Sequence, residues 1–421
     1  MPARQLPVRP DLAQIRREAE ELLRALHAGE SGALADLREF HPGQVDPAKA
    51  TLADAQLALA RSYDAPSWVR IEQSCRLIDA IWRDDVETVR DLVTAHPNLL
   101  HENAGVRNNN WGPPMSYAAN LGRDPIIEML HGLGARDLHS ALGRATLQSK
   151  IDTARMLHAK LGRPRAPAGS LDGPAYTLSA SGTALMFEFG AQVRDEHGQR
   201  LAPIDVVLET DSRKPEAKHA ILEMYVEHGF ELPDTPAMAL HRGRIDLLEE
   251  HLRRDPALLR RTFAHEEIYP PELGCHDEIL ATHGTPLAGA TLLHMCADYD
   301  ELEIARWLLE RGMDVDAKAA VDRDGFGGHT ALFATVVSQP NFWMNHQKQP
   351  QVAPFTQLLL DHGADPNARA SLRKQLHPGY GEETLHEYRD VTPLAWGERF
   401  HRQVFVSAAA LHLIADRGGH D

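Results

Sequence analysis

The apolar residues between positions 290 and 318 form two short helical patterns separated by a turn. The stretch reads ATLLHMCADYDELEIARWLLERGMDVDAK, and small and apolar residues fill it up to a short polar break. Beyond the break, Ile304, Trp307 and Leu308 recur at the spacing of one helix face. Gly312 then supplies a residue that can leave a helix through the left-handed conformation. The pattern therefore predicts two antiparallel helices followed by an extended loop.

Related patterns recur along most of the chain. PFTQLLLDHGADPNAR (354–369) repeats the second helix, its closing Gly363 and the extended exit, and Gly229 follows a similar helix further upstream. Leucines at several of these positions are expected to fill a shared core, namely Leu292, Leu308, Leu332, Leu359 and Leu394. Other copies occupy residues 77–93, 112–135, 138–162, 203–229, 236–252, 329–337 and 392–418, and the copy at 174–193 is the weakest.

The recurring unit resembles the ankyrin repeat, in which a β-turn and two antiparallel helices take about 33 residues. Residues 290–318 and 354–369 carry the resemblance best, and it extends over about residues 76–419. Unrelated helical hairpins are the alternative interpretation. Because such a unit buries its apolar face only against its neighbours, the resemblance implies an all-α ankyrin-repeat solenoid. It also implies a binding surface on the concave face and on the finger loops, the extended loops that join one repeat to the next.

The first 75 residues are predicted to be helical without being repeat-like. We expect a helical N-terminal cap on the solenoid, with Trp68 and Ile71 packed on the first repeat. A helix-turn-helix that reads DNA is the alternative, but acidic and basic residues are balanced here and no basic stripe appears on the last helix. The residues expected to begin the helices are Asp11 with Gln14 in a capping box, Ser31, Thr51 and, in the first turn of the last helix, Pro66.

An insertion at about residues 257–290 interrupts the repeats and concentrates imidazole and carboxylate groups. Such groups are what a divalent metal or a general acid–base site needs. Their spacing matches no metal motif, so a solvated or ligand-touching loop is the preferred interpretation, and no metal or cofactor is predicted. The groups are His265, Glu266, Glu267, Cys275, His276, Asp277, Glu278 and His283.

Two further insertions carry aromatic residues. The insertion at 338–353 places Phe342 and Trp343 in a polar loop, where they serve either to plug a cavity or to contact a partner. The insertion at 370–391 is longer than a passive finger loop and combines basic, histidine and tyrosine side chains. Between them and the first insertion, DRDGFGGHT (322–329) has glycines that let a backbone approach a ligand, although a plain turn is the preferred interpretation.

Finger loops of successive repeats lie side by side in a stacked array, so the loops at 257–290, 318–329 and 370–391 should meet. We expect them to form a site for an anionic or polar ligand, and no catalytic residue can be named from their spacing. The predicted ligand-binding residues are His276, His283, His329, Arg373, His377, Tyr380, His386 and Trp343.

Composition and net charge limit the classes of partner that the chain is expected to bind. The 421 residues are 43% hydrophobic and 25% charged, which is ordinary for a soluble globular protein. The formal net charge of −16 disfavours nucleic acids and anionic membrane surfaces as partners. Three widely spaced cysteines imply no disulfide framework. Without a secretion signal or a run of 18 apolar residues, we expect a cytoplasmic protein.

Protein recognition is the function that these observations favour. The ankyrin resemblance implies that the concave face and the finger loops bind a partner protein, whose surface should be basic or mixed to complement this acidic chain. The alternative is an enzyme or small-molecule binder with a pocket lined by His, Tyr and Arg in the C-terminal finger loops. An enclosed pocket would favour the alternative, and a flat groove would favour partner binding.

Overall fold

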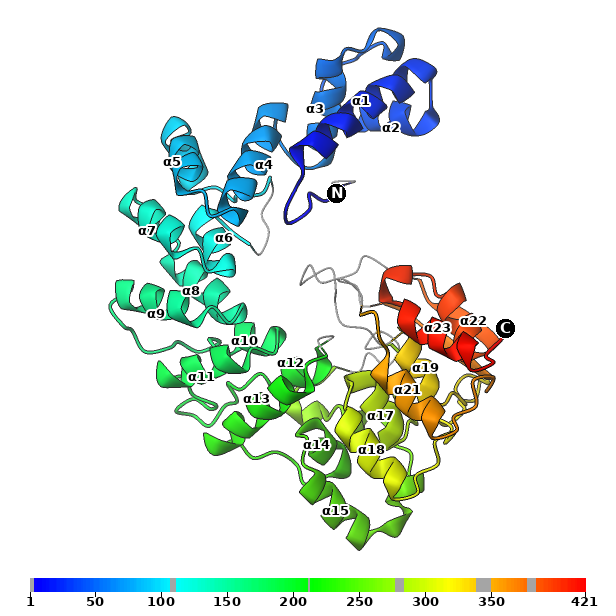
Figure 1. The fold of residues 1–421 in the computed structure, drawn as a ribbon. Coiled ribbons are helices and arrows are strands. Elements are labelled where there is room, and N and C mark those ends of the chain that lie inside the picture. The colour runs from blue at the N-terminus through cyan, green and yellow to red at the C-terminus, as the bar shows by residue number, and fades with distance from the viewer. Residues whose placement is uncertain (1–3, 107–110, 211–212, 277–283, 338–349, 377–383) are drawn as a thin grey trace. The chain divides into compact units, whose positions relative to one another are not determined.

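The computed structural model describes residues 4–106, 111–210, 213–276, 284–337, 350–376 and 384–421. Its contacts divide the chain into two compact units, and Figure 1 shows each as a succession of helices joined by loops. The first unit extends to Ala166 and includes Leu185–Gly190, and the second holds Pro167–Ala184 and the chain from Ala191 onward. Within the described residues, no helix combines the length and the apolar character needed to cross a membrane.

The helices of the first unit begin with a group that precedes the repeats. This group consists of α1 (Leu12–Ala28), α2 (Ser31–Phe40), the short 3₁₀ helix η1 (Pro47–Lys49) and α3 (Leu52–Ser62). The unit continues with α4 (Trp68–Trp82), α5 (Val86–Ala95), η2 (Pro97–Leu100), α6 (Pro114–Leu121), α7 (Asp124–Gly132), α8 (Leu138–Leu147) and α9 (Ile151–Lys160). The boundary between the units crosses α11 (Ala180–Glu188).

The second unit alternates helix pairs with long loops. Its first helices are α10 (Asp172–Tyr176), α12 (Ile204–Glu209), α13 (Pro215–Glu227), α14 (Pro236–His241), α15 (Ile245–Arg254), η3 (Pro256–Arg260), α16 (His265–Ile268) and η4 (Pro271–Leu273). They are followed by α17 (Leu292–Tyr299), α18 (Leu302–Glu310), α19 (Ala331–Val337), α21 (Pro354–Asp361), α22 (Pro393–Arg399), η6 (Gln403–Phe405) and α23 (Ala408–Asp416).

Side-chain caps begin two of the N-terminal helices as predicted. Asp11 accepts a hydrogen bond from the backbone N–H of Ala13 at the start of α1. Thr51 and Asp54 form a reciprocal capping box at the start of α3. Each cap satisfies backbone donors that a helix start otherwise leaves open.

Three details of the predicted helix starts are wrong. Ser31 is the first residue of α2 and does not cap it, because Gly29 and Glu30 alone separate this helix from α1. Pro66 precedes α4, which Ser67 caps. Gln14 donates to a glutamate on the next turn of α1 and closes no capping box there.

Trp68 and Ile71 pack differently from the prediction. Both belong to α4, and both contact the apolar cluster that α1, α2 and α3 enclose. Ile71 is fully buried in that cluster, whereas Trp68 is half-buried at its edge. The first half of α4, with Ile71 and Cys75, therefore belongs to the N-terminal core, and the rest of the helix packs on α5 and α6.

The opening sequence pattern forms the helix pair α17 and α18, as predicted. At the start of α17, the Thr291 hydroxyl lies 2.9 Å from Nδ1 of His294, and Nε2 of His294 lies 2.8 Å from the His329 carbonyl oxygen. A neutral imidazole carries a single N–H, so Nε2 donates to the carbonyl and Nδ1 accepts from the hydroxyl. His294 thereby ties its own helix to the finger loop that follows α18.

The predicted glycines and leucines hold their expected places. Gly229, Gly312 and Gly363 have φ values of 89°, 87° and 87° just after the second helices of their pairs. This left-handed conformation favours glycine and lets the chain leave the helix. Leu292, Leu308, Leu332 and Leu359 are fully buried, and Leu394 is half-buried.

The insertion at 370–391 contains an antiparallel hairpin of two strands, which the helical pattern did not predict. β1 (Ala370–Lys374) pairs with β2 (His386–Val391), with Leu372 opposite Tyr388 and Lys374 opposite His386. Alternate side chains of β1 are buried, as expected for a strand with one face on a core. The hairpin pairs the two described arms of this insertion.

Candidate functional site

The three finger loops predicted to converge are joined by backbone hydrogen bonds. The N–H of Ala320 donates to the carbonyl of Gly289 at 2.8 Å, and the N–H of Gly327 donates to the carbonyl of Ser371 at 2.6 Å. The N–H of Phe263 donates to Ala290 at 2.8 Å on the other side. We call these joined segments, residues 263, 286–290, 319–329 and 370–374, the finger rim.

Glycine makes this close approach possible at Gly327. Its φ is 119°, and a Cβ atom there would collide with the carbonyl oxygen of Ala320. A side chain at this position would collide with the opposite arm of the same loop and shift the Gly327 backbone, which is hydrogen-bonded to Ser371. The glycine-rich turn therefore has a structural role in bringing two backbones together.

The finger rim encloses a pocket with a volume of about 330 Å³. We call it the finger pocket. Each of the three loops contributes residues to its lining. Most of the lining is apolar, and its two charged groups are Asp322 and Arg373. It is lined by Pro286, Ala288, Ala320, Asp322, Phe326, Gly327, His329, Leu372 and Arg373.

His329 is the buried polar side chain of the finger pocket. It is 2% exposed, and neither ring nitrogen has a hydrogen-bond partner within the described structure. Burial, with a smaller contribution from His294, lowers the pKa of His329 to about 3, and the nearby Pro286 carbonyl opposes this shift. The ring is therefore neutral at physiological pH, and while its N–H is attracted to the Pro286 carbonyl, its other nitrogen remains available as an acceptor.

Arg373 forms the charged edge of the finger pocket. Its guanidinium lies 3.0 Å from Asp324, 3.8 Å from Asp322 and 3.5 Å from Glu387. It also covers the ring of Phe326, with 3.9 Å between the guanidinium carbon and the ring centroid. Because three carboxylates surround it, Arg373 is compensated within the protein and offers little net positive charge to a ligand.

The other predicted ligand-binding residues are not gathered in this pocket. His276 is exposed and lies against Glu209, 2.8 Å from its carboxylate oxygen. His386 lies on β2, where its ring stacks on His401 at a centroid distance of 3.7 Å. His283, His377, Tyr380 and Trp343 lie outside the described residues, as does Phe342. Of the predicted set, the described structure thus brings His329 and Arg373 together.

The insertion at 257–290 takes a course that the sequence did not predict. Part of it folds over α14 and α17 and does not remain in the finger. The carbonyl of Ile268 accepts a hydrogen bond from Nε2 of His241 at 3.0 Å, and the hydroxyls of Tyr269 and Tyr299 are hydrogen-bonded to each other. Every residue of α17 and of α19 is buried. A partner therefore has no side chain of these two helices to contact.

A group of buried charges lies beneath this insertion. Nζ of Lys218 is 3.6 Å from a carboxylate oxygen of Glu301, and Nε2 of His219 is 2.8 Å from the same oxygen. Burial lowers the pKa of Lys218 to about 8, and the Glu301 carboxylate opposes that shift. Nζ of Lys218 also lies 3.8 Å from the centroid of the Tyr299 ring. Lys218 and Glu301 are buried, and each has a partner of opposite charge in this group.

Sequence reasoning missed this group because its members come from α13, from the end of α17 and from the turn before α18. A lysine and a glutamate more than 80 positions apart give no local signal. Nor does the described structure contain a group of three or more His, Cys, Asp and Glu side chains placed to hold a metal ion.

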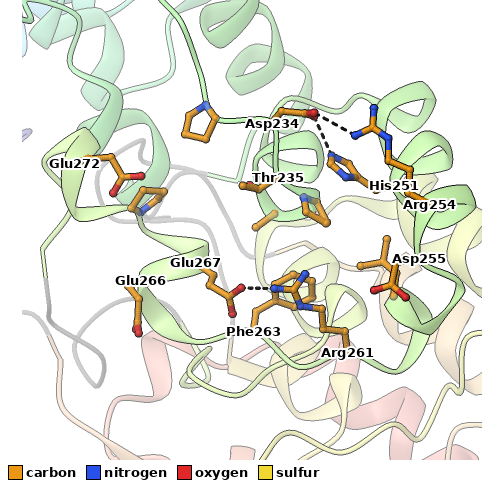
Figure 2. Close-up of a pocket in the computed structure, with 15 residues that line it drawn as sticks. Asp234, Thr235, His251, Arg254, Asp255, Arg261, Phe263, Glu266, Glu267 and Glu272 are labelled. Carbon is orange, nitrogen blue, oxygen red and sulfur yellow. Dashed lines mark hydrogen bonds and ion pairs between the residues drawn. The ribbon is translucent and has the colours of Figure 1, made fainter.

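A second pocket, of about 520 Å³, adjoins the finger rim at Phe263. Figure 2 shows its charged lining, where Asp234 pairs with His251 at 3.1 Å and with Arg254 at 3.3 Å. Arg261 pairs with Glu267 across the pocket. Glu266 and Glu272 also line it, and no ion-pair partner for either is found among the described residues. This acidic pocket gives the neighbouring edge a negative character.

Comparison with known protein families supports the repeat assignment at one segment. A family model described as the ankyrin repeat matches residues 288–320. Among solved structures, the chain is similar to the human ASB11 ankyrin repeat domain, with 17% identity, 73% of this chain and 99% of that chain covered, and a TM-score of 0.25. It is also similar to the ankyrin repeat domain of Bcl-3, with 15% identity, 65% and 97% covered, and a TM-score of 0.22. No curated protein matches the chain.

The matched segment coincides with α17, α18 and the finger loop that follows them. It is the same segment in which the sequence pattern, the buried leucine core and the left-handed glycine agree most closely. The chain is similar to ankyrin-repeat proteins and carries an ankyrin repeat at residues 288–320.

Proposed function

We propose that the chain is an interaction protein that recognises a partner protein through its finger rim. The observation that carries the proposal is the contrast between two surfaces of the second unit. The first helices α17 and α19 are wholly buried, whereas residues 320–325 of the finger rim are exposed, and backbone hydrogen bonds join their loop to its neighbours. Loops that are already ordered lose little conformational entropy on binding, which favours affinity.

The chemistry of the rim suits a protein surface. Val321 is 62% exposed at the tip of the loop at 319–329, next to the exposed residues Asp322, Arg323 and Asp324. An exposed apolar side chain beside charged residues is compatible with a protein interface that has a polar rim. The acidic pocket of Figure 2 adjoins the same edge, and its carboxylates favour a partner with a basic or mixed surface.

A small-molecule binder is the second candidate, and the finger pocket is the observation that favours it. Its volume of about 330 Å³ is near the lower end of the range of about 300–1,000 Å³ for small-molecule sites. The pocket lining includes no cysteine, serine or lysine that could act as a nucleophile beside His329. The pocket therefore supports binding better than catalysis, and it is large enough for one side chain of a partner.

Site-specific photocrosslinking tests the proposal. A photoreactive amino acid replaces Arg323 in the finger rim or, as a matched control, Arg306, an exposed arginine on α18. In extracts of the native cell we expect one dominant adduct from position 323 and none from 306. The crosslinked protein is then identified, purified and shown to bind the unmodified chain. Equal labelling from both positions, or binding that persists after the rim is altered by Val321→Asp, would contradict the proposal.

A further inference from the structure

His329 presents an unsatisfied buried polar group to the finger pocket. The residue is 2% exposed and lines the pocket, and neither ring nitrogen makes a hydrogen bond of normal geometry, although the Pro286 carbonyl interacts weakly with the ring. A buried polar group without a hydrogen bond is costly, and such groups in native proteins call for an explanation. By contrast, the neighbouring His294 has partners at both nitrogens. Unlike His294, His329 is therefore able to form a hydrogen bond with a group that enters the pocket.

The walls of the pocket define that group. Pro286, Ala288, Phe326 and Leu372 supply apolar surface, so the body of the entering group should be apolar, and the Phe326 ring favours an aromatic one. The one polar group that the entering group would meet at depth is the imidazole of His329, which is neutral.

A charged occupant is disfavoured at this position. The neutral imidazole provides no counter-charge, and Arg373 at the edge is already surrounded by Asp322, Asp324 and Glu387. Burying an ion without a partner carries a desolvation cost that the interactions in this site do not offset. Phosphorylated or carboxylate-bearing groups therefore fit less well than neutral ones, which revises the anionic ligand expected from the sequence.

We propose that the finger pocket receives the side chain of a tyrosine from the partner protein, with its hydroxyl hydrogen-bonded to the His329 ring. The inference rests on the proposed function, which supplies the partner. A phenol hydroxyl can donate or accept, so it matches either tautomer of the imidazole. Serine and threonine are too short to fill about 330 Å³, and phenylalanine would leave His329 unsatisfied.

The test uses p-cresol and toluene, the side-chain analogues of tyrosine and phenylalanine, with the full chain. Histidines labelled with carbon-13 are followed by NMR, and the His329 signal is assigned by its loss in His329→Phe. We expect both compounds to shift neighbouring signals, with p-cresol binding about tenfold more tightly because toluene leaves the imidazole unpaired. His329→Phe should abolish that preference while keeping toluene binding.

A pair of alanine variants locates the binding. Ala288→Leu fills the pocket from its wall and should weaken p-cresol binding at least tenfold. Ala415→Leu, at an exposed alanine of α23, is the matched control and should leave binding unchanged. Equal affinities of the two compounds, or p-cresol binding that survives Ala288→Leu, would overturn the inference.

The two proposals fail separately. If a partner crosslinks at position 323 but p-cresol shows no preference over toluene, the rim binds a partner without a tyrosine. If p-cresol binds as expected but no partner crosslinks, the pocket chemistry holds and the proposed protein recognition is wrong.

Discussion

Removing the charge of Glu301 tests the buried charge group that supports the second unit. Lys218 and Glu301 are each 3% exposed, with Nζ and a carboxylate oxygen 3.6 Å apart. Glu301→Gln keeps the shape of the side chain and its acceptor for His219, so the change isolates the loss of negative charge beside Lys218. Breaking a buried ion pair in this way ordinarily costs about 3–5 kcal/mol.

The structure predicts that Glu301→Gln costs less stability than this, because Lys218 can lose its proton and become neutral. Burial already lowers its pKa to about 8. At pH 7, which is one unit below this pKa, removing the proton from Lys218 costs about 1.4 kcal/mol. Lys218 can therefore contribute no more than about this amount to the loss of stability. The changed hydrogen bond with His219 adds a contribution of about 0.5–1.5 kcal/mol. We expect Glu301→Gln to lower the free energy of unfolding by about 1–3 kcal/mol at pH 7.

The pH dependence of this loss is the sharper prediction. The pKa of Lys218 is below its unfolded value, so the folded state binds fewer protons than the unfolded state between about pH 8 and 10.5. The stability contribution of Lys218 therefore rises with pH through this window. Near pH 9 the lysine is mostly neutral in the wild type as well, so the cost of Glu301→Gln should shrink to the contribution of the His219 hydrogen bond, about 0.5–1.5 kcal/mol. Lys218→Met should remove the pH dependence altogether.

Native-state hydrogen exchange of the α17 amides provides the assay, because it reports the opening of this part of the chain separately from the first unit. Glu303→Gln, on an exposed glutamate of α18, is the matched control and should change little. A loss of 4 kcal/mol or more that stays constant from pH 7 to 9 would refute the reasoning. It would mean that Lys218 remains charged without its partner.

Three further predictions follow from single residues. Gly327→Ala should raise hydrogen exchange across 319–329 and 370–374, because its Cβ collides with the backbone. The matched control Gly325→Ala, at a positive φ of 84° with open space at Cβ, should not. Equal effects of the two variants would argue against the collision. The pKa values of His294 and His329 fall to about 4 and about 3, chiefly through burial, so acid should destabilise the protein as pH falls below about 6.5, and NMR should show both rings neutral at pH 5.5. Burial raises the pKa of all three cysteine thiols, so a thiol reagent at pH 8 should label the native protein far more slowly than the unfolded chain.

The repeat was predictable because its signals are local. A helix pair needs apolar residues at helical spacing and a glycine at its exit, and residues 290–318 contain both. Asp11 and Thr51 were equally readable as caps, since a cap and its target lie within a few positions. The adjacency of the finger loops followed from stacking alone, which is why His329 and Arg373 were expected to be near each other.

The features that could not be predicted from the sequence depend on packing between residues far apart in the chain. The sequence could not distinguish His329 from the other histidines, because its unpartnered state results from two flanking loops far apart in the chain. Nor could it show that Ile268 and Tyr269 of the insertion fold back over α14 and α17, where Tyr269 is buried. The hairpin of β1 and β2 was hidden because its strands are joined by a long loop with mixed side chains.

The central claim is that the finger rim is the surface that binds a partner. Hydrogen exchange of the full chain, measured with and without the partner identified by crosslinking, tests it most directly. We predict that the partner slows exchange at 286–290, 319–329 and 370–374, while exchange in α1, α2 and α3 stays unchanged. Protection confined to the first unit, with none in the finger rim, would contradict the account.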